Sequence, residues 1–489
     1  MDNTEHSLTA SAAPAYNMAS PSIFRGSVSE RTGPSAAVVV YGLEQLARRA
    51  GVTEEALRRW RIDWTQRDYV TVFIQPGTRK RVRFPRASGV TWDDIQASKF
   101  RVSIAEWMPG APPKCESIPD FRVPFSSSPG ARVGALFAAD SPESFTCAVD
   151  LPLAATLTLA RYEETFPAPR DTHGRFPASS SIAFHHGFLH RPIVDEYGLA
   201  LEQVLERLLP AWRPSPRSLR VKISHDVDEI GVPFSPRGAA AKTLRHGRPF
   251  STLRDLAAPI FGVNNTYQSQ LKRLVRFSVD RDLDCSVHWK ASKRGLHDTG
   301  YRLSDPAILG LVHFFRERSI EMGIHPSYET FESPQLLRSE VATLRDFLGD
   351  QRTGGRQDYL RWSPPSWSEW DAIGISYDSS VGFADQTGFR AGTCIPYRPW
   401  LWREQREANL IEIPLLAMDS MLRGYMKAAP GRALAVLREL IVRCRSVGGV
   451  FTLAWHNTSL FDSGYTVVYR AVLDELAGTP KYDWRAASA

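Results

Sequence analysis

The stretch Leu219–Ile230, LRVKISHDVDEI, sets the pattern for the second half of this 489-residue chain. Its first residues alternate between apolar and polar side chains, and a period of two predicts a β-strand. Past Ser224 the apolar side chains give way to His225, Asp226 and Asp228. Because side chains alternate across a strand, the two aspartates are expected on one face. Carboxylates placed this way repel each other, so a metal ion, a shared proton or an arginine must offset the repulsion.

Strand and helix patterns alternate from about residue 216 onward. The predicted strands lie at 219–225, 284–289, 359–362, 375–378, 411–414 and 450–455, with a further short strand leading into Gly323. Repeated strand–helix units predict a parallel sheet, open or closed into a barrel. In such folds the chemistry lies at the C-terminal ends of the strands. Polar residues stand at these ends: Asp226, Asp228, His325, Arg361, Asp378 and His456.

Before this part, the sequence predicts a smaller mixed α/β domain of unknown role. We predict a disordered tail at 1–35, this domain at 36–215 and the larger domain at 216–489. The tail is polar and lacks the basic start and apolar core of a signal peptide, which indicates a cytoplasmic protein. The apolar run AAVVVY at 36–41 is predicted to be a buried strand, followed by a short helix at 43–49.

Charge and composition argue against several kinds of partner. The net charge of +7 would suit nucleic acid or an anionic substrate. The basic residues are dispersed, however, and form no stripe with aromatic residues, so no nucleic-acid partner is expected. No apolar run is long enough to cross a membrane. Five scattered cysteines without a CxxC motif indicate reduced thiols. The sequence makes no prediction of the oligomeric state.

Several histidines and acidic residues lie close together at 171–176, at His185–His186 and at 191–197. Their spacings match no ligand pair on a helix or a strand. We therefore interpret this region as a structured loop that packs the first domain on the second, in preference to a metal site.

Five motifs, in order, resemble the polysaccharide deacetylase (NodB-homology) family of carbohydrate esterases. They are HDVD, GIHPSY, YLRWSPP, YDSSVGFAD with GFRAGTC, and the late WHN. The resemblance covers roughly residues 150–465. Within this family, the sequence most resembles a branch that is found among bacterial surface-polysaccharide genes and carries an uncharacterised N-terminal domain. It implies a distorted (β/α) barrel with fewer than eight strands and a divalent metal ion at its mouth.

The resemblance also implies roles for single residues. Asp226 matches the catalytic base and Asp228 the metal-binding aspartate, although the family usually has the two adjacent and here one residue separates them. His325 matches the first metal-binding histidine. Arg361 matches the arginine that holds the base, and His456 the histidine that protonates the leaving amine.

The third metal ligand stays open at this point. Glu329 stands where the family has its second histidine, and Asp358 stands where the narrower branch usually has one. Either carboxylate can supply an oxygen ligand, or the site has lost its metal. Zinc is the favoured ion, with other divalent ions open because aspartates suit harder metals. Four further residues are predicted to contact the substrate: Tyr328, Asp378, Arg390 and Trp455.

Together these features predict a metal-dependent hydrolase that acts on a carbon–nitrogen bond other than a peptide bond. The predicted substrate is an N-acetylated or O-acetylated sugar of bacterial surface-polysaccharide metabolism. In the expected mechanism the metal polarises the acetyl carbonyl, Asp226 takes a proton from water, and His456 as imidazolium protonates the departing nitrogen. The alternative is a metal-free carbohydrate-binding or scaffold protein that retains the same fold.

Overall fold

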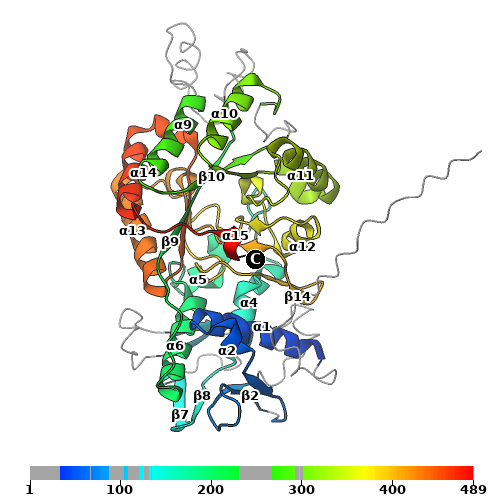
Figure 1. Ribbon diagram of the computed structural model, residues 1–489, viewed down its shortest axis with the longest axis vertical. Helices are drawn as coiled ribbons and strands as arrows, with labels where there is room; N and C mark the ends of the chain where they lie inside the picture. Colours follow the sequence, from blue (N-terminus) through cyan, green and yellow to red (C-terminus); the bar gives the residue numbers. More distant parts are fainter. Residues whose placement is uncertain are drawn as a thin grey trace, which may run out of the picture.

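The structure of this chain is a computed structural model with a mixed α/β fold, as predicted (Figure 1). It describes residues 33–66, 68–86, 104–107, 121–125, 132–133, 135–230, 267–291, 297 and 301–487. The N-terminal part lies at the bottom of Figure 1, and the C-terminal part above it surrounds its strands with helices. Most of the tail predicted at 1–35 lies outside the described residues, but residues 33–35 already belong to the first helix.

The N-terminal part combines two sheets with packed helices. One sheet has the strand order β1-β2-β3-β8-β7, and the other has the order β5-β4-β6. The elements are α1 (Gly33–Arg49), α2 (Glu54–Leu57), β1 (Arg61–Asp63), β2 (Tyr69–Phe73), β3 (Arg81–Pro85), β4 (Ile104–Trp107), β5 (Phe121–Pro124), β6 (Arg132–Val133), β7 (Phe137–Ser141), β8 (Ser144–Cys147), α4 (Leu151–Leu159), α5 (Ile182–His185) and α6 (Ile193–Leu208).

Helix α1 corrects the sequence prediction for residues 36–41, which form part of this helix and not a strand. A short apolar run fits a buried helix as well as a buried strand, so periodicity alone cannot separate the two. The helix packs on α4 and α6. A Cβ at Gly42 would lie 1.9 Å from the carbonyl oxygen of Pro152, so the glycine allows α1 to approach α4 this closely.

The C-terminal part is built around a parallel sheet with the order β11-β10-β9-β17-β16. Figure 1 shows α13 and α14 on the left of the strands, α9 and α10 above them, and α11 and α12 on the right. The elements are β9 (Arg220–Asp226), α9 (Tyr267–Val279), β10 (Cys285–Trp289), α10 (Pro306–Arg316), β11 (Glu321–Ile324), α11 (Pro334–Leu348), α12 (Pro364–Ala372), β12 (Tyr377–Asp378), β13 (Trp400–Leu401), β14 (Arg406–Glu407), β15 (Ile411–Glu412), β16 (Ala417–Met418), α13 (Pro430–Val447), β17 (Val450–Ala454), α14 (Ser463–Leu476) and α15 (Trp484–Ala487).

Beyond β11 the sheet continues through single β-bridges. Gly355 bridges Ile324 on one side and Asp378 on the other, and β12 then pairs in parallel with β15. Between β15 and β16 the described residues form no ladder, so the closed, distorted barrel is not confirmed. The strand predicted at 359–362 is wrong, because this segment forms a 3-10 turn, η5 (Asp358–Leu360).

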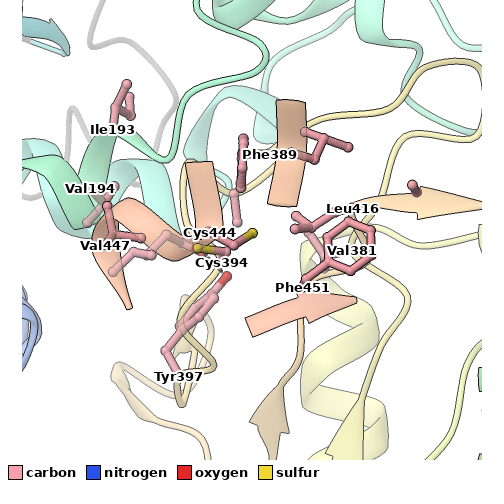
Figure 2. Close-up of a cluster of buried hydrophobic side chains, with 14 of the residues drawn as sticks. Ile193, Val194, Val381, Phe389, Cys394, Tyr397, Leu416, Cys444, Val447 and Phe451 are labelled. Atoms are coloured by element: carbon pink, nitrogen blue, oxygen red, sulfur yellow. Dashed lines mark hydrogen bonds between the residues drawn. The ribbon is translucent and has the colours of Figure 1, made fainter. Parts of the chain in front are cut away.

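One hydrophobic core runs through both parts of the chain. Figure 2 shows Ile193 and Val194 of α6 near Cys444 and Val447 of α13, with Cys394 beside them. All four cysteines that the structure describes are buried thiols without a disulfide, as expected. The two predicted domains therefore pack against each other through apolar side chains.

A buried ion pair joins the same two parts. Arg390 donates from Nε and one terminal nitrogen to the two carboxylate oxygens of Glu164, at 2.9 and 2.6 Å. Arg161 donates to the same carboxylate at 2.8 Å. Burial raises the pKa of Glu164, but the two arginines outweigh burial and lower it, so this acid stays ionised.

We expect Glu164→Gln to lower the free energy of unfolding by about 3–5 kcal/mol, because it leaves the buried Arg390 without its counter-charge. Glu475→Gln is the matched control, since its ion pair with Arg438 is largely exposed and should contribute about 1 kcal/mol or less. Urea denaturation of both variants measures the difference. Equal losses would show that the Glu164 pair does not hold the two parts together.

No helix within the described ranges has both the length and the apolar character needed to cross a bilayer.

Candidate active site

The C-terminal ends of the parallel strands surround a cavity of about 1000 Å³. Asp226 ends β9, His325 follows β11 directly, and Asp419 follows β16 directly. Arg175, from the loop at 171–176 of the N-terminal part, also lines the cavity. The polar and aromatic residues that line it include Arg175, Asp226, Asp228, His325, Arg356, Asp358, Tyr359, Asp419, Arg423, Tyr425 and His456.

Asp226 is a buried carboxylate held from two sides. Arg356 donates to both of its oxygens at 3.0 Å, and Nδ1 of His288 lies 2.8 Å from Oδ1. Burial raises the pKa of Asp226, but the charge of Arg356 and the nearby histidines outweigh burial and hold it well below its usual range. Asp226 is therefore an ionised carboxylate in a fixed orientation at the base of the cavity.

Arg361 does not hold this carboxylate, contrary to the sequence prediction. Its Nε donates to the carbonyl oxygen of His173 at 3.0 Å, and another nitrogen donates to that of Tyr328 at 2.9 Å. A third nitrogen forms an ion pair with Glu332. Arg361 thus ties the N-terminal loop to the rim of the cavity, and the arginine on Asp226 is Arg356.

Asp228, His325 and Asp358 form a group that could hold a metal ion, with one donor atom from each within 4.8 Å of the others. His325 Nε2 lies 3.4 Å from Asp228 Oδ1 and 3.3 Å from Asp358 Oδ1. Donor atoms about 2.0–2.2 Å from a tetrahedral ion lie about 3.3–3.6 Å apart, so these spacings fit zinc. His325 donates from Nδ1 to the carbonyl oxygen of Arg356 at 2.7 Å, which directs Nε2 to the other two residues.

Two further observations favour a cation at this place. Asp228 Oδ1 is buried and accepts no hydrogen bond of ordinary geometry, and its nearest positive partner, Lys290 Nζ, lies 3.4 Å away, so it has room for a closer cation. Burial lowers the pKa of His325, but the nearby carboxylates of Asp226, Asp228 and Asp358 raise it to about 10. The cluster attracts positive charge, and these residues fit a divalent ion.

Glu329 was the other candidate for the third ligand. Its side chain is exposed, and it does not belong to this group. We expect Asp358→Asn to weaken the affinity for Zn²⁺ by at least about ten- to a hundredfold, the range for groups that only support a ligand. Glu329→Gln is the control and should bind Zn²⁺ like the wild type in a calorimetric titration. If only Glu329→Gln lost Zn²⁺ binding, Glu329 and not Asp358 would be the third ligand.

His456 faces the cavity after the end of β17. It donates from Nδ1 to Asp419 Oδ1 at 2.6 Å, and its Nε2 lies 3.5 Å from Asp228 Oδ2. Burial lowers the pKa of His456, but the charge and hydrogen bond of Asp419 and the charge of Asp228 raise it to about 9. The acidic partners therefore make this histidine a cation at neutral pH.

Three of the four predicted substrate contacts are buried, and two of these are charged residues. Arg390 is the buried partner of Glu164. Asp378 is fully buried and accepts a hydrogen bond from the backbone N–H of Ser380 at 2.9 Å. Burial raises the pKa of Asp378 to about 7, even though the hydrogen bonds from Ser380 lower it. Neither side chain lines the cavity.

The other two predicted contacts have different surroundings. Trp455 is fully buried and stacks on Tyr469, with the ring centroids 5.0 Å apart, so it faces the outer helices. Tyr328 is partly buried near the rim, where its hydroxyl lies 3.1 Å from His173 Nδ1 and its ring centroid 5.2 Å from that of Tyr359. Tyr359 lines the cavity, and Tyr328 supports it from behind.

Four residues that contact the predicted site residues were not predicted from the sequence: Lys290, His288, Arg356 and Asp419. Lys290 directly follows β10, so the strand-end signal used for the other residues could have found it. His288 lies inside a predicted strand, and neither Arg356 nor Asp419 follows a strand that the sequence predicted.

The loop at 171–176 packs the N-terminal part on the C-terminal part, as predicted. Arg175 donates to the carbonyl oxygen of Tyr359 at 2.9 Å and to the hydroxyl of Tyr425 at 2.7 Å, and all three residues line the cavity. The N-terminal part therefore contributes to the wall of the candidate site.

Comparison with known proteins gives a partial match. Residues 64–210 match a family of unknown function, DUF7033. No curated protein matches the chain.

Three solved structures are similar to part of this chain, and each is described as a polysaccharide deacetylase. One is from Mycobacterium smegmatis, with 14% identity and a TM-score of 0.39 over 57% of this chain and 91% of that chain. One is from Bordetella bronchiseptica and is assigned to O-antigen biosynthesis, with 12% identity and a TM-score of 0.30 over 56% and 90%. The third is from Pseudomonas aeruginosa, with 11% identity and a TM-score of 0.36 over 56% and 90%. Because all three TM-scores lie below 0.5, we base the function proposed below on the side chains of the cavity.

Proposed function

We propose that this protein is a metal-dependent hydrolase that removes an acetyl group from an N- or O-acetylated sugar of a bacterial surface polysaccharide. One observation carries the proposal: three complementary groups meet at a single cavity. These are the fixed carboxylate of Asp226, the candidate ligands Asp228, His325 and Asp358, and the hydrogen-bonded pair of His456 and Asp419.

A divalent ion held by the three ligands would supply Lewis-acid chemistry to an acyl carbonyl. The protein's own residues supply the proton transfers. Asp226, oriented by Arg356 and His288, takes a proton from the attacking water as the water oxygen bonds to the carbonyl carbon. His456 gives its proton to the departing nitrogen as the C–N bond breaks, which leaves acetate and an amine.

The order of motifs that resembles the polysaccharide deacetylases supports this reaction and this class of substrate. The volume of the cavity, about 1000 Å³, leaves room for more than one sugar unit. We also propose that the boundary between the two domains lies between residues 215 and 216. The parallel sheet of the second domain is proposed to close into a distorted barrel.

The experiment is an acetate-release assay on N-acetylated oligosaccharides with metal-stripped, full-length protein. We expect release after Zn²⁺, Mn²⁺ or Co²⁺ is restored, and none with chelator present. Release that is unaffected by chelator would contradict the metal-dependent mechanism.

One observation favours the second candidate, a metal-free carbohydrate-binding protein. The ammonium group of Lys290 lies 2.7 Å from Asp358 Oδ2, so this carboxylate already has a positive partner. This candidate predicts that oligosaccharides bind with equal affinity in the presence and absence of chelator and that no acetate appears.

A further inference from the structure

Lys290 is a buried lysine placed directly beside the candidate metal ligands. It follows β10 and is 2% exposed. Its Nζ lies 2.7 Å from Asp358 Oδ2 and 3.4 Å from Asp228 Oδ1. Lysine is almost never fully buried unless it is paired, and this one is paired with two of the three candidate ligands. Its positive charge therefore acts directly on these two candidate ligands.

The backbone and the packing around Lys290 hold it in place. Its backbone N–H donates to the hydroxyl of Tyr301 at 2.8 Å. Tyr301 in turn packs edge-on against Trp289, the residue before Lys290, with the ring centroids 6.3 Å apart. These contacts fix the backbone of Lys290, and the hydrogen bond to Asp358 fixes its ammonium group.

The two oxygens of Asp358 serve different partners. Oδ2 accepts from Lys290, whereas Oδ1 accepts from the backbone N–H of Tyr359 at 3.0 Å and lies 3.3 Å from His325 Nε2. Lys290 therefore does not contact the oxygen of Asp358 that faces His325. It neutralises the carboxylate without blocking it.

We propose that Lys290 is a positioning residue that limits the affinity of the site for its divalent ion. The inference rests on the metal site of the proposed function. When His325 binds a metal ion it must be neutral, so the three ligands and the charged Lys290 together carry one negative charge, whereas Asp228 and Asp358 alone carry two. A cation fixed next to two ligands repels a divalent ion in a poorly solvated site, where charges interact more strongly than in water. The bound ion is consequently weakly held and exchangeable.

The test is a calorimetric titration of metal-stripped, full-length protein with Zn²⁺ and, separately, Mn²⁺. We expect Lys290→Met to bind both ions at least about tenfold more tightly than the wild type, because the repelling charge is gone and a methionine fills a similar volume. The rise in the melting temperature on addition of Zn²⁺ should also be larger in this variant, since the stabilisation by a bound ligand grows with the logarithm of its affinity.

Lys222→Met is the matched control. Lys222 is also buried and paired, with its Nζ 2.5 Å from Glu321 Oε2, but Glu321 is not a candidate ligand. Loss of this lysine should lower the melting temperature and leave the affinity for both ions unchanged.

Lys290→Gln keeps a hydrogen-bond donor for Asp358 and removes only the charge. If the methionine variant fails to fold, the same titration of Lys290→Gln tests the inference. Unchanged or weaker binding in the folded variants would overturn the inference and leave the metal site in place. If neither the wild type nor the variants bind Zn²⁺ or Mn²⁺, the inference and the metal-dependent function both fail. Binding by the variants alone would support the inference.

Discussion

Asp226→Asn is expected to lower turnover on an N-acetylated sugar by about a hundredfold to ten-thousandfold, the typical contribution of a general base. Asparagine has nearly the same shape and keeps an oxygen that accepts from Arg356, so the hydrogen bond at 3.0 Å can persist. The amide cannot take a proton from water. Because Asp226 lies outside the group of candidate ligands, the variant should bind Zn²⁺ within a few-fold of the wild type.

Turnover and calorimetric affinity must be measured on the same preparation of Asp226→Asn. Asp371→Asn is the control, because Asp371 is also a buried carboxylate paired with an arginine, Arg406, but does not line the cavity. The control should lose stability and keep its turnover. Full activity in Asp226→Asn would remove Asp226 from the role of base, and loss of Zn²⁺ from it would make Asp226 a ligand.

Much of the site could be predicted because its residues follow strands with clear patterns. The alternation in β9 placed Asp226 and Asp228 on one face, and both line the cavity. The strand β17 led to His456 in the same way. Where long apolar strands run in parallel, their carboxyl ends meet at one edge, and polar residues there become neighbours.

The segment after Gly355 shows why the other residues could not be predicted. Gly355 itself joins the sheet through single bridges, which leave no periodic pattern in the sequence. Tyr359 and Leu360 both have positive φ, 57° and 53°, a conformation that non-glycine residues rarely adopt. This turn carries Arg361 away from Asp226, whereas Arg356, before the turn, reaches it.

Asp419 was missed for a related reason. It follows β16, a strand of only two residues, which is too short for alternation to reveal. The role of Asp419 appears only when β16 pairs with β17 and brings its carboxylate to His456.

The second large effect is expected at His456. His456→Ala should lower turnover on an amide substrate by about a hundredfold to ten-thousandfold, because the nitrogen leaves poorly unless it is protonated. On an activated ester, whose leaving group needs no proton, the loss should be much smaller. Zn²⁺ affinity should persist, since the candidate ligands remain.

The pH dependence gives an independent test of the same role. The pKa of His456 is raised to about 9, so the imidazolium is present below that pH and is lost as the pH rises through it. Turnover of the amide should therefore fall on the alkaline side, while turnover of the ester should not show this fall.

Asp419→Asn tests what holds the proton on His456. The charge of Asp419 is the largest of the effects that raise this pKa, so its removal should move the alkaline fall to lower pH for the amide alone. Equal losses on amide and ester in His456→Ala would indicate a structural role, and loss of Zn²⁺ would make His456 a ligand. An alkaline fall that stays in place in Asp419→Asn would mean that a group other than His456 supplies the proton to the departing nitrogen.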